Sequence, residues 1–199
     1  EQRQSLDLSC WRVAFNGAEP VRSQTLERFA AEFADCGFRR EAFYPCYGMA
    51  ETTLIVSGGR YTHPPVIQTV QKMALEQHRI VDAAIDILVP DEIQSLVGCG
   101  QTIPQQQIVI AHPETLTRCA PDEVGEIWVS GPSVGQGYWQ RPEETAQIFR
   151  VHLADTGERP FLRTGDLGFL QDGELFVTGR VKDLIIIRGR NLYPQDIEL

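Results

Sequence analysis

The feature that most constrains the fold of this chain is the dipeptide Asp172-Gly173, within the stretch 161–194. Apolar runs stand on both sides of it, at 169–170 and at 175–177. Asp-Gly flanked by apolar residues is among the strongest short-range signals for a β-hairpin with a tight turn. The sequence therefore predicts two strands that meet at this turn.

The predicted hairpin also brings two opposite charges together. Asp166 leads into the first strand and Arg180 leaves the second, so a carboxylate and a guanidinium reach the same end of the pair. A carboxylate can accept both hydroxyls of a ribose, and an arginine beside it suits hydroxyls or phosphate. For these residues alone, a surface ion pair that closes the hairpin is the simpler explanation. The rest of the chain favours a nucleotide site.

The composition narrows the class of protein. With 42% hydrophobic residues the chain can bury a core, and 23% charged residues is ordinary for a soluble protein. The formal net charge of −9 at pH 7 argues against a general nucleic-acid surface. No apolar run reaches membrane-spanning length, and no signal peptide is visible.

The cysteines and histidines suggest neither a disulfide framework nor a metal cluster. The four histidines are scattered along the chain. The cysteines are odd in number and lack C-x-x-C spacing, which favours reduced thiols in a cytoplasmic protein. They are Cys10, Cys36, Cys46, Cys99 and Cys119.

The N-terminal part predicts a strand, a turn and a helix. Alternating residues at 11–15 indicate a short strand that runs into a turn at 16–20. Small residues in such a turn let backbone approach a flat ligand closely, although the sequence there is by itself only a turn. Ser23 is expected to cap the following helix and Gly37 to end it. The apolar face of that helix consists of Leu26, Phe29, Ala30 and Phe33.

A second predicted strand, 42–47, ends at the sequence Y-G-M-A-E. Ligands of α/β sheets bind beyond the carboxyl ends of the strands, so this end of the strand is a candidate site. Tyr47 can stack on a base, and Glu51 can hold a magnesium ion that bridges phosphates. Taken singly, the two residues fit a packed aromatic and a solvated acid.

The remainder of the chain predicts short strands. Residues 57–96 are expected to be an ordered excursion, because their apolar runs are too frequent for disorder. Those runs are 66–67, 80–81 and 85–89. Beyond residue 98, strands at 107–111 and 125–130 favour a small antiparallel barrel. Pro142, followed by acids, is the expected start of a helix.

Four motifs occur in order along the chain, each weak alone and very specific together. They are N-G-A-E-P (16–20), Y-G-M-A-E (47–51), G-E-I-W-V-S-G-P-S-V-G-Q-G-Y (125–138), and T-G-D (164–166) followed by G-R-V-K-D-L-I-I-I-R-G-R (179–190). On these motifs, essentially the whole chain resembles the acyl- and aryl-CoA synthetases, luciferases and peptide-synthetase adenylation domains. Those proteins activate carboxylates as acyl-adenylates.

The resemblance implies a fold and a domain organisation. The fold would be α/β: the C-terminal portion of the adenylate-forming large domain, with part of an α/β sheet layer and a small antiparallel β-barrel subdomain. Residues 1–97 would belong to the large AMP-binding domain and include an insertion at about 57–96. Residues 98–180 would form the β-rich subdomain, and 181–199 the hinge and the start of the C-terminal domain.

The resemblance also implies roles for individual residues. Gly17 and Ala18 would line the adenine, with Tyr47 stacking on it, and Asp166 would take the ribose hydroxyls with help from Arg180. The implied nucleotide-binding set is Gly17, Ala18, Glu19, Tyr47, Gly48, Met49, Ala50, Asp166 and Arg180. Glu51 would be the metal ligand and act in catalysis through magnesium. Lys182 matches the hinge of the C-terminal domain, and Arg188-Gly189-Arg190 would be the loop that this domain presents to the site.

The residues of several motifs resemble those of the fatty acyl-AMP ligases more closely than those of the wider superfamily. These are L-I-I-I-R-G-R-N-x-Y-P-Q-D-I-E, G-M-A-E and V-S-G-P-S-V, together with the long connection 57–96. In that group the insertion is thought to restrain the C-terminal domain, so that the acyl group passes to an acyl-carrier protein and not to coenzyme A. Ala50 replaces a threonine of many relatives, as in the acyl-AMP ligase pattern, and Leu192 stands where family members often carry histidine.

The implied function is ATP- and Mg²⁺-dependent adenylation of a fatty acid for an acyl-carrier protein, in a polyketide, lipopeptide or lipid pathway. A long-chain acyl-CoA ligase is the near alternative, and a non-catalytic nucleotide-binding scaffold is an alternative of another class. The family's phosphate-binding loop is expected before Glu1 and its catalytic lysine after Leu199. This stretch by itself is therefore expected to be inactive.

Overall fold

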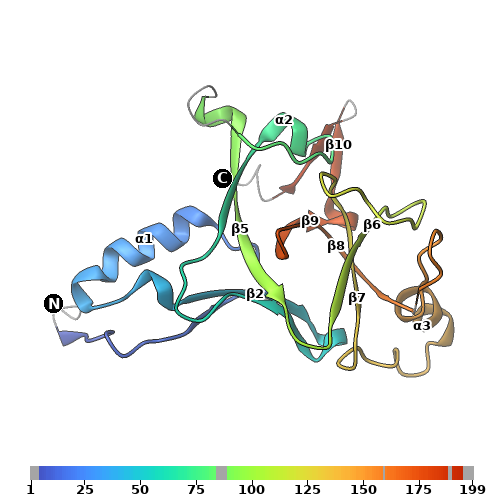
Figure 1. Ribbon diagram of the computed structural model, residues 1–199, viewed down its shortest axis with the longest axis horizontal. Coiled ribbons are helices and arrows are strands. Elements are labelled where there is room, and N and C mark those ends of the chain that lie inside the picture. The colour runs from blue at the N-terminus through green and yellow to red at the C-terminus, as the bar shows by residue number, and fades with distance from the viewer. Residues whose placement is uncertain (1–4, 84–88, 159, 188–189, 195–199) are drawn as a thin grey trace.

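The computed structural model describes residues 5–83, 89–158, 160–187 and 190–194. In this part of the chain a nine-stranded sheet has the order β1-β2-β3-β5-β9-β8-β7-β6, with β4 paired to β5, and β10 and β11 form a separate pair (Figure 1). The strands are β1 Ala14–Asn16, β2 Phe43–Met49, β3 Leu54–Gly58, β4 Ile67–Gln71, β5 Ile93–Thr102, β6 Gln107–Ala111, β7 Gly125–Ser130, β8 Leu162–Gln171, β9 Glu174–Arg180, β10 Ile185–Ile187 and β11 Arg190–Leu192. The helices are α1 Ser23–Phe33, α2 Lys72–Leu75 and α3 Pro142–Phe149.

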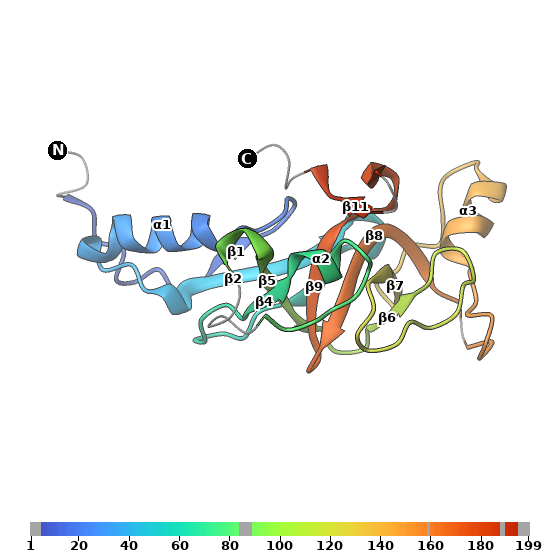
Figure 2. The same ribbon diagram turned by 90° about the horizontal axis from the view of Figure 1, so that it is seen from above.

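Two of the helices lie at opposite ends of the molecule. Seen from above, α1 is at one end and α3 at the other, with the sheet between them (Figure 2). Short 3₁₀ turns connect several of the strands: Ala34–Cys36, Arg40–Ala42, Ala50–Thr52, Pro90–Glu92 and Val181–Asp183. The chain is thus a mixed α/β structure in which the sheet is the continuous element.

The β1–β2 pair is parallel and the other pairs are antiparallel. Parallel neighbours need a crossover connection, and α1 supplies it. The predicted apolar face of α1 packs on these strands in a cluster that includes Leu26, Phe38 and Phe43. The α/β character of the fold therefore comes from this N-terminal unit.

The details at both ends of α1 differ from expectation. Ser23 is the first helical residue and not the cap, because the extended backbone of Arg22 takes the cap position without a side-chain hydrogen bond. Gly37 does end the helical segment, with φ 82°, but only after the added 3₁₀ turn. The preceding strand is also shorter than predicted, since pairing with β2 begins at Ala14 and excludes Trp11.

The predicted hairpin is confirmed. β8 and β9 pair through Gln171 and Glu174, and the two turn residues Asp172 and Gly173 have φ of 52° and 80°. Positive φ at both central residues matches the right-handed twist of the strands, which explains the Asp-Gly sequence. The helix predicted at Pro142 is likewise confirmed as α3, with acids in its first turn.

The central strand β5 pairs with β3, β4 and β9. The predicted division of the chain at residue 97 falls within this strand. The division remains a prediction. β5 also carries the excursion 57–96 back into the sheet: β4 lies along it, and Val70 and Leu75 are fully buried. The run 85–88 lies outside the described residues.

The five cysteines are all free. In the described part of the chain, no helix has the length and apolar character needed to cross a membrane.

Candidate functional site

The carboxyl end of β2 and the open end of the β8–β9 hairpin meet at Asp166. Arg180 faces Asp166 across the hairpin and donates from Nε to Oδ1 over 3.1 Å. The phenol of Tyr47, on β2, donates to Oδ2 over 2.7 Å. Both carboxylate oxygens are therefore held, and three residues that the sequence assigned to one nucleotide site lie in direct contact.

Burial sets the chemistry of this cluster. The side chain of Asp166 is 15% exposed, whereas that of Arg180 is 52% exposed. Burial, followed by the charge of Asp166, raises the pKa of Tyr47 well above its ordinary value. Tyr47 therefore stays protonated and acts as a neutral donor. Asp166 can accept hydroxyl groups at its partly exposed edge, as a ribose-binding carboxylate does.

The turn at 16–20 lies beside the same end of β2. Asn16 pairs with Pro45, which brings Gly17 against Cys46. A Cβ at Gly17 would lie 3.0 Å from the Cys46 carbonyl oxygen, a tight contact that would require the backbone to shift by a few tenths of an ångström. Ala18 has φ 68°, an uncommon left-handed conformation for a residue with a side chain. The turn is thus held in a specific shape against Cys46, the residue before Tyr47.

The sequence Gly48-Met49-Ala50 has a structural explanation in addition to its predicted binding role. A Cβ at Gly48 would overlap the carbonyl oxygen of Leu54, where β2 and β3 approach at a bulge. The hydroxyl of Thr52 donates to the Met49 carbonyl over 2.9 Å and closes the 3₁₀ turn that carries Glu51. This turn fixes the direction in which Glu51 leaves the strand.

Glu51 has a partner that the sequence did not reveal. The phenol of Tyr138 donates to Glu51 Oε1 over 2.7 Å, and this hydrogen bond is the first cause that raises the pKa of Tyr138, to about 12. The backbone carbonyl of Glu51 accepts from the amide of Gly135 over 2.7 Å. Tyr138 is the last residue of the G-Q-G-Y sequence that ends the 125–138 motif, so the motif marked it as a candidate. No local pattern linked it to Glu51, which is 87 residues away in sequence.

Glu51 fits a magnesium ion only as one ligand among several. Among the described residues, no three His, Cys, Asp or Glu side chains come together as a metal site. Magnesium in nucleotide sites is usually bound by one or two carboxylates, water and the substrate phosphates. The half-buried carboxylate of Glu51 meets that requirement for a metal that arrives with a nucleotide.

Lys182 lies in the exposed turn that follows β9, and the segment after it contacts the excursion 57–96. Arg190 Nε donates to Glu76 Oε2 over 2.6 Å. The backbone amide of Asn191 donates to the Glu76 carbonyl over 2.9 Å. Tyr193 is buried in the cluster that contains Leu75. Arg188 and Gly189 lie outside the described residues.

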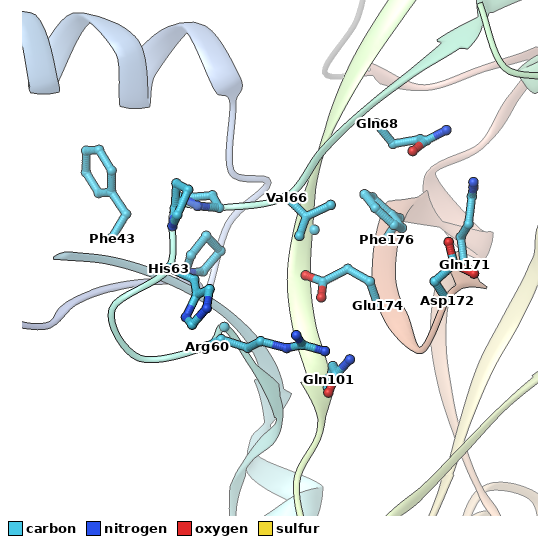
Figure 3. Close-up of a pocket in the computed structure, with 15 residues that line it drawn as sticks. Phe43, Arg60, His63, Val66, Gln68, Gln101, Gln171, Asp172, Glu174 and Phe176 are labelled. Carbon is cyan, nitrogen blue, oxygen red and sulfur yellow. The ribbon is translucent and has the colours of Figure 1, made fainter. Parts of the chain in front are cut away.

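A cavity of about 350 Å³ lies at the other end of the hairpin (Figure 3). Its lining includes the turn residue Asp172 and the buried Glu174, toward which Arg60 extends (Figure 3). Glu174 Oε1 accepts from the Gly100 amide over 2.7 Å, and a Cβ at Gly98 would overlap the carboxylate. Glu174 thus supports the irregular pairing of β5 with β9. β9 separates this cavity from Arg180 by roughly 20 Å at the usual rise per residue.

Known proteins are similar in sequence to this chain over all or nearly all of its length. The medium-chain-fatty-acid–acyl-carrier-protein ligase JamA of Moorena producens is 55% identical over 203 residues, covering 100% of this chain and 33% of JamA. The long-chain-fatty-acid–AMP ligase FadD32 of Mycolicibacterium smegmatis is 40% identical over 203 residues, covering 97% of this chain and 32% of FadD32. The chain thus spans about a third of the length of the curated relatives it matches.

Solved structures agree with the sequence relatives. The fatty acyl-adenylate ligase of L. pneumophila, in complex with acyl adenylate and pyrophosphate, matches with a TM-score of 0.85 at 50% identity, over 99% of this chain and 34% of that chain. An adenylation domain of a keto acid-selecting NRPS module, bound to keto acyl adenylate, matches with a TM-score of 0.79 at 29% identity, over 98% of this chain and 36% of that chain. A sequence profile of AMP-binding enzymes matches residues 1–139. The chain therefore belongs to the AMP-binding enzyme family and, within it, resembles the fatty acyl-AMP ligases along its whole length.

Proposed function

We propose that this chain forms the nucleotide-binding part of an enzyme that activates a fatty acid as an acyl-adenylate and passes the acyl group to an acyl-carrier protein. The observation that carries the proposal is Asp166, whose two oxygens are held by Tyr47 and Arg180. A scaffold domain needs no such arrangement of a partly exposed carboxylate. The names of the relatives supply the substrate class.

The predicted nucleotide-binding residues have distinct tasks in this proposal. Gly17 and Ala18 bring backbone against the adenine, and Tyr47 contacts it while its phenol aligns Asp166. Asp166 accepts the two ribose hydroxyls, and Arg180 holds the carboxylate and adds positive charge near the phosphates. Glu19 and the residues 48–50 shape the two turns that border the nucleotide.

The proposed reaction joins an oxygen of the fatty carboxylate to the α-phosphorus of ATP. The bond from that phosphorus to the bridging oxygen breaks, and pyrophosphate leaves with the bond's electron pair. Positioning and charge stabilisation do most of the work in such a displacement. Magnesium, when bound, offsets the negative charge of the phosphates. Glu51 is the residue of this chain that would hold it.

The contacts of the C-terminal segment support the proposed choice of acceptor. Glu76, in the excursion 57–96, binds both Arg190 and Asn191. We therefore propose that the excursion restrains the segment beyond the hinge at Lys182, so that coenzyme A is a poor acceptor. In this proposal 98–180 is the barrel subdomain, 181–199 begins the C-terminal domain, and the enzyme acts in the cytoplasm in a polyketide or lipid pathway.

The test is an assay of the full-length enzyme with ATP, magnesium and a fatty acid, with and without coenzyme A, read by mass spectrometry. Acyl-AMP that accumulates despite coenzyme A, and is consumed when a carrier protein is added, is the expected result. Efficient acyl-CoA formation would favour a long-chain acyl-CoA ligase.

A companion variant tests the scaffold alternative. Asp166→Ala should abolish binding of AMP by the full-length protein and leave the protein folded, as its circular dichroism spectrum would show. Asp91→Ala, at an exposed position in the turn Pro90–Glu92, is the matched control. If the Asp166 variant binds AMP as well as wild type does, and the wild-type enzyme forms no acyl-AMP, then a non-catalytic scaffold is the better description.

A further inference from the structure

We propose that Tyr138 is a positioning residue that holds the Glu51 carboxylate in the orientation in which it receives the nucleotide's metal ion. This inference rests on the proposed function, because it concerns the same site. The observation is the 2.7 Å hydrogen bond from the Tyr138 phenol to Glu51 Oε1. Groups that hydrogen-bond to a metal-binding carboxylate commonly fix its orientation, and their loss weakens metal binding.

Tyr138 is itself fixed by helix α3. Its backbone amide donates to Thr145 Oγ1 over 2.9 Å, and its ring meets Phe149 edge to face at 5.1 Å. Thr145 and Phe149 are both buried. A Cβ at Gly137, which has φ 142°, would overlap the side chain of Thr145. Because glycine has no Cβ, the loop can pass close to the helix. Backbone and ring are thus both anchored, and the phenol has a defined direction.

The turn that carries Glu51 is fixed to the same loop by two further contacts. The Glu51 carbonyl accepts from the Gly135 amide over 2.7 Å. The hydroxyl of Thr53 donates to the Ser133 carbonyl over 2.8 Å. These contacts place loop 131–141 against the turn independently of the phenol. The Tyr138–Glu51 hydrogen bond therefore belongs to a built interface between two segments that are distant in sequence.

A phenol suits the role of an orienting partner. It is a neutral donor at physiological pH, so it directs the carboxylate without offsetting its charge. Asp166 differs, because its partner Arg180 is a cation. A carboxylate has about four acceptor positions, so one hydrogen bond from Tyr138 leaves capacity for a cation. The arrangement keeps the full negative charge of Glu51 in a fixed place.

The experiment measures metal binding directly in the full-length protein. Tyr138→Phe keeps the ring contact with Phe149 and removes only the hydroxyl. With a non-hydrolysable ATP analogue present, free Mn²⁺ is followed by electron paramagnetic resonance. Tyr138→Phe should weaken Mn²⁺ binding by about 10-fold or more, within the range known for such partners. Binding of the analogue in EDTA should stay at the wild-type level, which a general loosening of the site would not permit.

Two controls make the outcome decisive. Trp139→Phe alters the neighbouring residue, which is 88% exposed, and should leave Mn²⁺ binding unchanged. If Tyr138→Phe fails to fold, Thr145→Val releases the amide of Tyr138 and should weaken Mn²⁺ binding in the same direction. Wild-type Mn²⁺ affinity in Tyr138→Phe, or in Thr145→Val where that variant is needed, would overturn the proposal.

The outcome is separable from that of the proposed function. If the wild-type protein makes no acyl-AMP and Tyr138→Phe still weakens Mn²⁺ binding, the ligase function is rejected and the role of Tyr138 is supported. If the wild-type protein makes acyl-AMP and Tyr138→Phe binds Mn²⁺ as well as wild type, the ligase function is supported and the role of Tyr138 is rejected.

Discussion

The phenol of Tyr47 donates a 2.7 Å hydrogen bond to Asp166 across 119 residues of sequence. It joins the carboxyl end of β2 to the open end of the β8–β9 hairpin. Because Arg180 holds the other oxygen of Asp166, the carboxylate is fixed from two sides. The proposed nucleotide site is therefore held in place by contacts within the protein.

Removing that phenol should weaken nucleotide binding. In Tyr47→Phe, one oxygen of Asp166 loses its donor while the ring stays in place. Hydrogen bonds to charged groups are worth about 1.5–3 kcal/mol, so we expect AMP affinity to fall by about 10-fold or more in calorimetric titration of the full-length protein. Tyr61→Phe, at a position 52% exposed, is the control. Equal affinities of Tyr47→Phe and wild type would contradict the role of this contact.

The proposal that the excursion 57–96 restrains the segment beyond Lys182 is tested more sharply by a substitution at Glu76 than by deletion of the whole excursion. Deletion would also remove Val70 and Leu75, which are fully buried. In Glu76→Ala, Arg190 loses its partner while the backbone contact to Asn191 remains available. The full-length variant should form measurable acyl-CoA from preformed acyl-AMP, read by mass spectrometry, where wild type forms little.

The matched control for Glu76→Ala is Glu92→Ala, an exposed acid of the same excursion. Acyl-CoA formation equal to wild type in both variants would show that the Glu76–Arg190 contact does not restrict the acceptor.

The bulge between β2 and β3 should tolerate no side chain at Gly48. Gly48→Ala forces a Cβ into the backbone carbonyl of Leu54, and overpacking of this kind costs about 1–3 kcal/mol. The full-length variant should melt several degrees lower in differential scanning fluorimetry. Gly59→Ala is the matched control, since its Cβ would meet nothing closer than 3.6 Å. Similar melting temperatures of the two variants would refute this explanation of Gly48.

The buried thiol of Cys99 should be inert in the native protein. Burial is the first cause that raises its pKa, to about 12, so its reactive thiolate is scarce even at mildly alkaline pH. Raising the pH from about 7 to about 9 converts much of an ordinary cysteine, whose pKa is about 8.5, to thiolate, whereas Cys99 stays almost entirely protonated over this range. Iodoacetamide labelling, read by peptide mass spectrometry, should modify Cys99 only after denaturation. Labelling that rises with pH in the native protein would contradict this.

The sequence alone determined the local elements of this fold. Asp172-Gly173 determined the hairpin, because few residues other than Gly, Asn and Asp adopt two consecutive positive φ values easily. The spacing of apolar residues determined α1, and Pro142 with the acids after it determined α3. Ser23 failed as a cap because the boundary depends on the backbone of Arg22. The hairpin register also placed Asp166 opposite Arg180, as the sequence predicted.

Only the tertiary structure decided which distant residues meet. Tyr47 with Asp166, Tyr138 with Glu51 and Glu76 with Arg190 are separated by 119, 87 and 114 residues. No periodicity encodes such pairs, because they depend on how β5 joins its neighbours and on which side chains are then buried. The chemical types of the site could be read from motifs, since each motif shapes its own backbone locally. Their orientation could not, because it is set by partners that the completed sheet brings into contact.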